Sequence, residues 1–76
     1  MWKDVDDKLY QKFLFEDFIA AFAFISKVAI LTEKMGHHAT ITNTYNTVEL
    51  WLTTHDKGNK VTEKDTKLAA AITAIL

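Results

Sequence analysis

The three histidines of this chain, His37, His38 and His55, are the side chains best suited to moving protons. A histidine can donate or accept a proton near neutral pH, which is what general acid and general base catalysis require. Glu33 precedes His37 by one helical turn, so we expect its carboxylate to reach back toward that ring and support a proton on it. The pattern indicates a small acid–base site, although the residues alone do not identify its substrate.

Other interpretations of these and nearby residues remain open at this point. Isolated surface histidines are ordinary in proteins. A three-histidine metal site is a further interpretation, but adjacent histidines lack the spacing that metal ligands usually have, and we predict no metal. Asp65 has the position of a helix cap, and Trp51 that of a core or interface residue. The chain has no glycine-rich phosphate-binding loop, and its only serine, Ser26, lies within a predicted helix.

The elements that must position the histidines are predicted in the order β-β-α-β-β-α. We expect strands at Trp2–Val5, Leu9–Phe15, Thr40–Tyr45 and Val48–Thr53, with turns at Asp6–Lys8 and at Asn46 with Thr47, and a loop at Asp56–Lys60. The last strand alternates apolar and polar residues, which places His55, near its end, on the face away from the core. The order predicts an α+β fold, a four-stranded antiparallel sheet with helices packed on one face.

The long helix is predicted to begin after a cap at Glu16 or Asp17 and to end at Gly36, which tolerates the left-handed conformation of a C-terminal cap. Its expected core stripe is Phe18, Phe22, Ile25 and Ala29. Further apolar residues surround this stripe, namely Ile19, Ala23, Phe24, Val28, Ile30 and Leu31. A helix this apolar is expected to meet another subunit. We therefore predict a homo-dimer or homo-tetramer through the helix Phe18 to Leu31.

The final helix is predicted to start at a capping box formed by Thr62 and Asp65. Its core side is expected to hold Leu68, Ile72 and Ile75.

Length and charge limit the classes of protein that remain. The 76 residues are enough for one domain, and the chain has no cysteine to form a disulfide. Nine basic residues against ten acidic ones leave no basic surface for direct nucleic-acid binding. The longest apolar segment is shorter than the roughly 20 residues that a membrane-spanning helix needs. No signal peptide is recognisable, so we predict a cytoplasmic protein that does not bind membranes.

The spaced residues Glu33, His37-His38, Tyr45, His55 and Asp65 resemble the signature of the pterin-4a-carbinolamine dehydratases. That signature has an acidic residue four positions before a His-His pair, then an aromatic residue, a third histidine and an aspartate. The resemblance extends to framework residues along the chain, including Trp2, Leu9 to Phe13, Asp17-Phe18, Ala21-Phe22, Val28-Ala29 and Leu68-Ala69. It implies a single pterin-4a-carbinolamine dehydratase-like domain over residues 1–76.

The resemblance implies a function and a set of site residues. Members of this family dehydrate 4a-hydroxytetrahydrobiopterin to quinonoid dihydropterin, which recycles the pterin of aromatic amino acid hydroxylases. His37 and His55 would share the acid and base roles, and His38 would bind and orient the pterin with some catalytic contribution. Residues bordering the substrate would be Gly36, Thr53, Thr54 and Asp56, and the histidines would be supported by Glu33 and Asp65. The pterin is a substrate, so no cofactor is implied.

Two residues depart from the family pattern. Ala39 stands where the family usually has proline, and Ile41 stands where an aromatic residue is usual. Loss of the proline is expected to loosen His38, and loss of the aromatic residue to remove a wall of the pterin pocket. The alternative to catalysis is a non-catalytic pterin-binding, dimerisation or transcriptional coactivator module, since vertebrate relatives also act as partners of a transcription factor.

Overall fold

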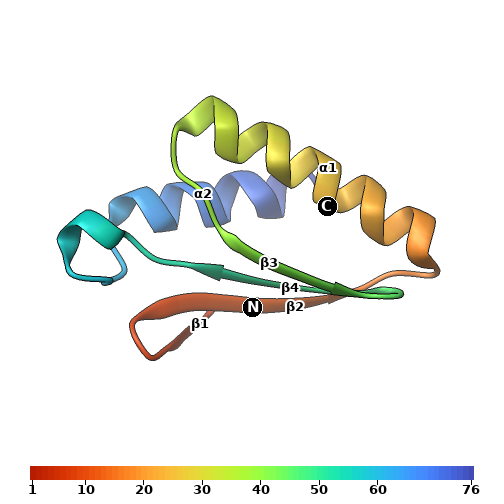
Figure 1. Cartoon of the computed structure of the whole chain (residues 1–76), viewed down its shortest axis with the longest axis horizontal. Coiled ribbons are helices and arrows are strands. Elements are labelled where there is room, and N and C mark those ends of the chain that lie inside the picture. Colours follow the sequence, from red (N-terminus) through yellow and green to blue (C-terminus); the bar gives the residue numbers. More distant parts are fainter.

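Four strands and two α-helices form the protein in the computed structural model, which describes residues 1–76. The elements are β1 (Lys3–Val5), β2 (Lys8–Leu14), α1 (Phe18–Met35), β3 (Thr40–Thr44), β4 (Thr47–Leu52), a short 3-10 helix η1 (His55–Lys57) and α2 (Glu63–Ala74). The strands form one antiparallel sheet in the order β1-β2-β4-β3. Both helices cover the same face of this sheet (Figure 1). The predicted α+β fold and order of elements are confirmed.

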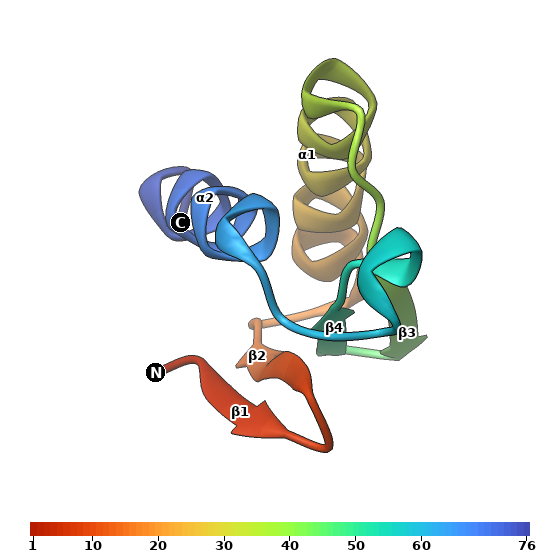
Figure 2. The same cartoon turned by 90° about the vertical axis from the view of Figure 1, so that its left-hand side faces the viewer.

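The two faces of β4 have different environments, as its alternating sequence predicts. Val48, Leu50 and Leu52 are fully buried beneath the helices. On the opposite face Trp51 pairs with Tyr10 of β2 on one side and with Thr40 of β3 on the other. Figure 2 shows the helices on one side of the strands only, so this second face has no covering layer.

The core lies between β2, β4 and the two helices. Phe24 of α1 contacts Phe13 and Phe15, with ring centroids 4.8 Å and 5.0 Å apart respectively. Leu68 and Ile72 of α2 are fully buried against the same cluster, as predicted. Ile75 lies beyond the end of α2 and is only partly buried. Neither helix has the length and apolar character needed to cross a membrane.

The buried stripe of α1 differs from the predicted one. The residues that face the core are Ala21, Phe24, Val28 and Thr32. Two members of the predicted stripe, Phe18 and Phe22, are 46% and 52% exposed. Ile25 is partly buried and Ala29 is exposed. The prediction was wrong because this helix is apolar nearly all round, and hydrophobic period alone does not say which side faces the sheet.

The ends of α1 agree with the predictions. The Asp17 side chain caps the helix by accepting a hydrogen bond from the amide of Ala20 at 2.8 Å. Gly36 ends it in the left-handed conformation, with φ of 64°. The chain then turns directly into His37, whose amide bonds the carbonyl of Thr32 at 3.1 Å. The helix end therefore fixes where the histidine pair begins.

The predicted β3–β4 turn is placed one residue earlier along the chain. The β3–β4 turn consists of Tyr45 and Asn46, and the left-handed residue is Tyr45, with φ of 51°. Thr47, which was predicted to be in the turn, already belongs to β4. Asn43 fixes this arrangement, because its side-chain amide donates to the carbonyl oxygens of Tyr45 and Thr47.

Candidate active site

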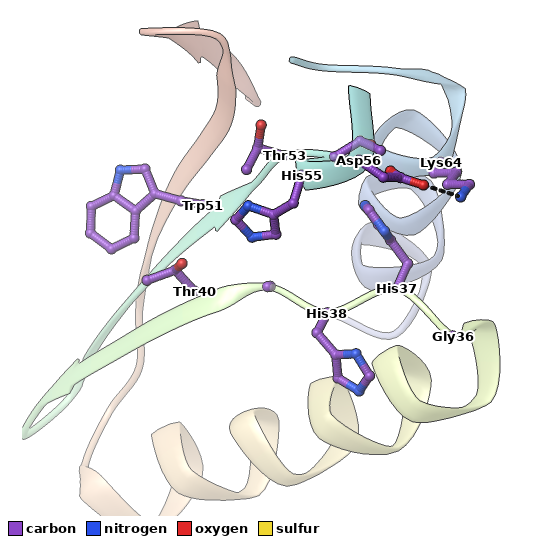
Figure 3. Close-up of a pocket in the computed structure, with 11 residues that line it drawn as sticks. Gly36, His37, His38, Thr40, Trp51, Thr53, His55, Asp56 and Lys64 are labelled. Carbon is purple, nitrogen blue, oxygen red and sulfur yellow. Dashed lines mark ion pairs between the residues drawn. The ribbon is translucent and has the colours of Figure 1, made fainter. Parts of the chain in front are cut away.

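A cavity of about 350 Å³ opens where the loop after α1, the end of β4 and the start of α2 meet. All three histidines line it, and so do the four residues predicted to border a substrate, Gly36, Thr53, Thr54 and Asp56. In Figure 3 the His37 ring rises from its loop toward Asp56, the His55 ring lies between Trp51 and His37, and His38 points away from both toward α1. The structure therefore brings the predicted residues to one cavity but gives the three rings different orientations.

His37 is held by Asp65 from α2. Its ring Nε2 lies 2.5 Å from Asp65 Oδ1, and the two side chains are 13% and 0% exposed. The second oxygen of Asp65 accepts hydrogen bonds from the Thr54 hydroxyl at 2.7 Å and from the Thr62 amide at 2.9 Å. The carboxylate thus joins the histidine loop, the end of the sheet and the first turn of α2.

The ionisation of Asp65 follows from these contacts. Burial of the carboxyl group by itself raises its pKa, but the hydrogen bonds from His37, Thr62 and Thr54 and the charge of His37 lower the pKa of Asp65 below its usual value of 3.8. Asp65 is therefore ionised at neutral pH, and His37 Nε2 donates a proton to it.

The same carboxylate completes the predicted capping box of α2. Asp65 accepts from the Thr62 amide, while the Thr62 side chain accepts from the first turn of the helix. The capping box is confirmed, and Asp65 is both a helix cap and the partner of a histidine. A spacing pattern identifies the first role, but the second depends on tertiary structure.

His55 lies outside the fourth strand, in contrast to its predicted position. The strand ends at Leu52, and His55 begins the 3-10 helix η1. Its Nδ1 lies 2.7 Å from the side-chain oxygen of Asn59, so Nδ1 carries the proton and Nε2 is free to accept one. Two backbone hydrogen bonds between Thr54 and Lys60, of 3.0 and 3.4 Å, close this loop.

Thr53 is buried, although strand alternation predicted that it would share the exposed face with Trp51. Its hydroxyl donates to the backbone carbonyl of Asp7 at 3.1 Å, so the β1–β2 turn covers this side chain. Thr54 is also buried, and its hydroxyl is engaged by Thr62 and Asp65.

Glu33 contacts the other histidine of the pair. Its Oε1 lies 3.0 Å from Nε2 of His38, and both side chains are exposed. The prediction that Glu33 reaches back to His37 is wrong. The backbone leaves the helix at Gly36, and this change of direction carries the His37 ring toward α2 and leaves His38 beside the last turn of α1.

Sequence reasoning missed several residues at the cavity. Lys64 lines it, with its ammonium group 3.9 Å from the Asp56 carboxylate. Trp51 and Thr40 also line it, and Asn59 orients His55. The position of Lys64 in the first turn of α2, next to Asp65, could have indicated that Lys64 lies at the cavity. No residue near Asn59 in the sequence indicated that Asn59 bonds to His55. No three histidine, aspartate or glutamate side chains are grouped so that they could hold a metal ion.

Comparison with known proteins gives a consistent set of relatives. A family model described as "Pterin 4 alpha carbinolamine dehydratase" matches residues 1–75. A protein of Prochlorococcus marinus (strain NATL2A) is 52% identical over 73 residues, which are 95% of this chain and 76% of the relative. One from Rhodopseudomonas palustris (strain HaA2) is 47% identical over 76 residues, 97% of this chain and 74% of the relative. Both are described as "Putative pterin-4-alpha-carbinolamine dehydratase".

Two solved structures have the same fold. A transcriptional coactivator/pterin dehydratase from Brucella melitensis superposes with a TM-score of 0.91 and is 41% identical, covering 97% of this chain and 80% of its own. A pterin dehydratase-like protein identified as a RuBisCO assembly factor in the alpha-carboxysome has a TM-score of 0.81 and covers 96% of this chain and 86% of its own. At 24% identity, the second likeness concerns the fold alone.

Proposed function

Because this chain belongs to the pterin 4 alpha carbinolamine dehydratase family, we propose that it dehydrates 4a-hydroxytetrahydrobiopterin to quinonoid dihydropterin by histidine acid–base catalysis. The observation that carries the proposal is the pair of oriented imidazoles at one cavity, His37 bound to Asp65 and His55 bound to Asn59. Hydroxide is a poor leaving group, so the reaction needs a proton donor at the departing oxygen and a proton acceptor at the ring nitrogen.

His37 is assigned the acid role. The ionised carboxylate of Asp65 contacts Nε2 of the ring, so the other ring nitrogen, Nδ1, is not engaged by this carboxylate. In the proposed reaction His37 gives a proton to the 4a-oxygen. The carbon–oxygen bond breaks, and the hydroxyl group leaves as water.

His55 is assigned the base role. Asn59 holds the proton on Nδ1, so Nε2 has a free lone pair. In the proposed reaction His55 accepts the proton from the ring nitrogen next to C4a, and the electron pair of that N–H bond forms the carbon–nitrogen double bond. Gly36, Thr53, Thr54 and Asp56 would border the pterin, and His38 would help to orient it from the rim.

The proposal is tested by following 4a-hydroxytetrahydrobiopterin directly. The compound is generated by a hydroxylase reaction, and the decay of its absorbance is recorded in stopped flow with and without this protein. We expect decay that accelerates in proportion to protein concentration. The same test with His37→Ala and His55→Ala links any acceleration to the cavity and excludes a contaminating enzyme. Decay at the buffer rate with folded wild-type protein would refute the enzymatic proposal.

A second candidate function is an interaction module, and the exposed side of α1 favours it. Ile19 and Ile30 are 78% and 68% exposed, and the rings of Phe18 and Phe22 lie 5.6 Å apart on the same surface. We propose that the helix Phe18 to Leu31 forms a homo-dimer or homo-tetramer. The Brucella relative is described as both coactivator and dehydratase, so an interaction role does not exclude catalysis. A folded oligomer without dehydratase activity would favour the interaction function.

A further inference from the structure

Trp51 lies on the sheet face opposite the core, and its side chain lines the candidate cavity. It is only partly buried, and its backbone pairs with Thr40, which lines the same cavity. In Figure 3, Trp51 and His37 lie on opposite sides of His55. The indole therefore forms the end of the site that is remote from the His37–Asp65 pair.

The rest of the cavity offers little surface to a planar ring. Only two of the eleven lining residues are hydrophobic, and these are Ala39 and Trp51. The others present hydroxyl groups, imidazoles, charged groups or a glycine backbone. Trp51 is thus the only large apolar side chain that a flat heterocycle in this cavity could contact.

The residue expected to supply an aromatic wall does not reach the cavity. Ile41 occupies the position at which the family usually has an aromatic residue. Ile41 pairs with buried Leu50 and packs against the core cluster, and it does not line the cavity. Position 41 and position 51 thus lie on opposite faces of the sheet. The aromatic surface at this site comes from β4 instead of β3.

The Trp51 ring is held in place by a cluster on the open face of the sheet. The Tyr10 ring lies 5.2 Å from it, centroid to centroid, at an interplanar angle of 42°. The Tyr10 hydroxyl donates to Glu49 Oε2 at 2.5 Å, and the Thr42 hydroxyl lies 3.5 Å from Glu49 Oε1. Tyr10 therefore supports one side of the indole and is itself anchored at its far end. A ring fixed in this way loses little side-chain entropy when a ligand stacks on it.

We propose that Trp51 is a positioning and specificity residue that stacks against the planar bicyclic ring of the substrate and directs its C4a side toward the two histidines. This inference rests on the proposed function and names the surface that selects the substrate. Stacking on an aromatic side chain is favourable for any flat heterocycle, so Trp51 would favour a pterin over an aliphatic hydroxy compound of similar size.

The first test compares Trp51→Ala and Trp51→Phe with the wild-type protein. The dissociation constant for 7,8-dihydrobiopterin is measured by calorimetry, and kcat and KM by the dehydration assay. We expect Trp51→Ala to raise the dissociation constant and KM about tenfold, with kcat changed by less than about threefold. Trp51→Phe should restore most of the binding. The control is Trp2→Phe, since Trp2 is partly buried against the core cluster, donates to Thr73 at 3.0 Å and does not line the cavity.

The second test uses folded proteins that keep one tryptophan each. Acrylamide quenching of tryptophan fluorescence is measured with and without 7,8-dihydrobiopterin. The ligand should protect Trp51 from the quencher in Trp2→Phe protein and should not change the quenching of Trp2 in Trp51→Phe protein.

The outcomes separate this inference from the proposed function. Unchanged catalysis and pterin binding in Trp51→Ala would overturn the role of Trp51 and leave the proposed function standing. Ligand binding that leaves Trp51 fully accessible to acrylamide would do the same. Wild-type protein that neither binds the pterin nor accelerates dehydration would overturn both.

Discussion

The His37 imidazole and the Asp65 carboxylate are separated by 28 positions in the sequence, and their Nε2 and Oδ1 atoms lie 2.5 Å apart. Each residue comes from the end of a different helix, since His37 follows the C-terminus of α1 and Asp65 belongs to the first turn of α2. The pair therefore forms only when both helices are docked on the sheet. Asp65 is fully buried, so its charge depends on partners that the fold supplies.

Asp65→Asn is predicted to lower the free energy of unfolding and to make that free energy depend less on pH. The pKa of Asp65 is lower in the folded protein than in the unfolded chain, so the unfolded chain binds a proton more readily. The stability that this carboxylate contributes is therefore lost as the pH falls from about 4 through the folded-state pKa. At pH 7 the substitution should lower the free energy of unfolding by roughly 1–3 kcal/mol. Urea unfolding from pH 7 to the acid limit measures both effects.

The matched control for this change is Glu63→Gln, which removes an exposed carboxylate from the same helical turn. We expect its pH profile to follow that of the wild-type protein. Parallel profiles of wild type and Asp65→Asn over the acid range would contradict the role given to Asp65.

His37→Ala is predicted to abolish most dehydratase activity without unfolding the domain. Loss of a general acid lowers kcat on the order of 10² to 10⁴-fold. His38→Ala is the comparison, because that ring lies at the rim of the cavity, is 65% exposed and contacts Glu33, which does not line the cavity. We expect a loss below about tenfold for His38→Ala. Circular dichroism checks the fold of each variant, and equal losses for the two would show that His37 has no special role.

Gly36→Ala is predicted to destabilise the protein through its backbone. Gly36 has φ of 64°, a conformation that costs an L-residue about 1 kcal/mol or more. An added methyl group would meet no atom within 4 Å from residues beyond its chain neighbours, so the cost comes from the backbone conformation and not from contact with the rest of the fold. Gly36→Asn should cost less, since asparagine tolerates this conformation. Thermal or urea unfolding measures the difference, and equal stability of the alanine and wild-type proteins would contradict the argument.

Phe22→Glu is predicted to dissociate the proposed oligomer. The Phe22 side chain is 52% exposed on the apolar side of α1, and a carboxylate there would be buried without a partner in any interface that covers it. Sedimentation velocity should show a dimer or tetramer for the wild type and a monomer for the variant. Ala70→Glu, at an exposed position of α2, makes the same change in charge and should leave the assembly intact. A wild-type monomer at micromolar concentration would refute the interface.

Local patterns were sufficient to predict most of the fold. The alternation of β4, the cap at Asp17, the left-handed Gly36 and the capping box at Thr62 each depend on residues close together in sequence. The buried side of α1 was mistaken because the choice depends on fit to the sheet. Small Ala21 and Thr32, whose hydroxyl donates to the Ala29 carbonyl, lie on that side in preference to larger side chains.

The candidate site was predictable in its members but not in its pairings. The histidines and their neighbours could be named from the sequence, whereas the partners of His37 and His55 could not. Glu33 illustrates the difficulty, because its spacing from His37 suits a continuous helix and the helix ends at Gly36 before the pair begins. Trp51 was assigned to core or interface because a strand pattern does not show that the start of β3 and the end of β4 lie beside a cavity.

The two oxygens of Asp65 serve the helix start and the imidazole at the same time. Unwinding of a single helical turn would thus release the ring from its orientation while the sheet stayed intact. Turnover should then disappear on gentle heating before the aromatic core melts, because short terminal segments open at lower free energy than the interior. Loss of turnover on heating would therefore report the unwinding of the first turn of α2.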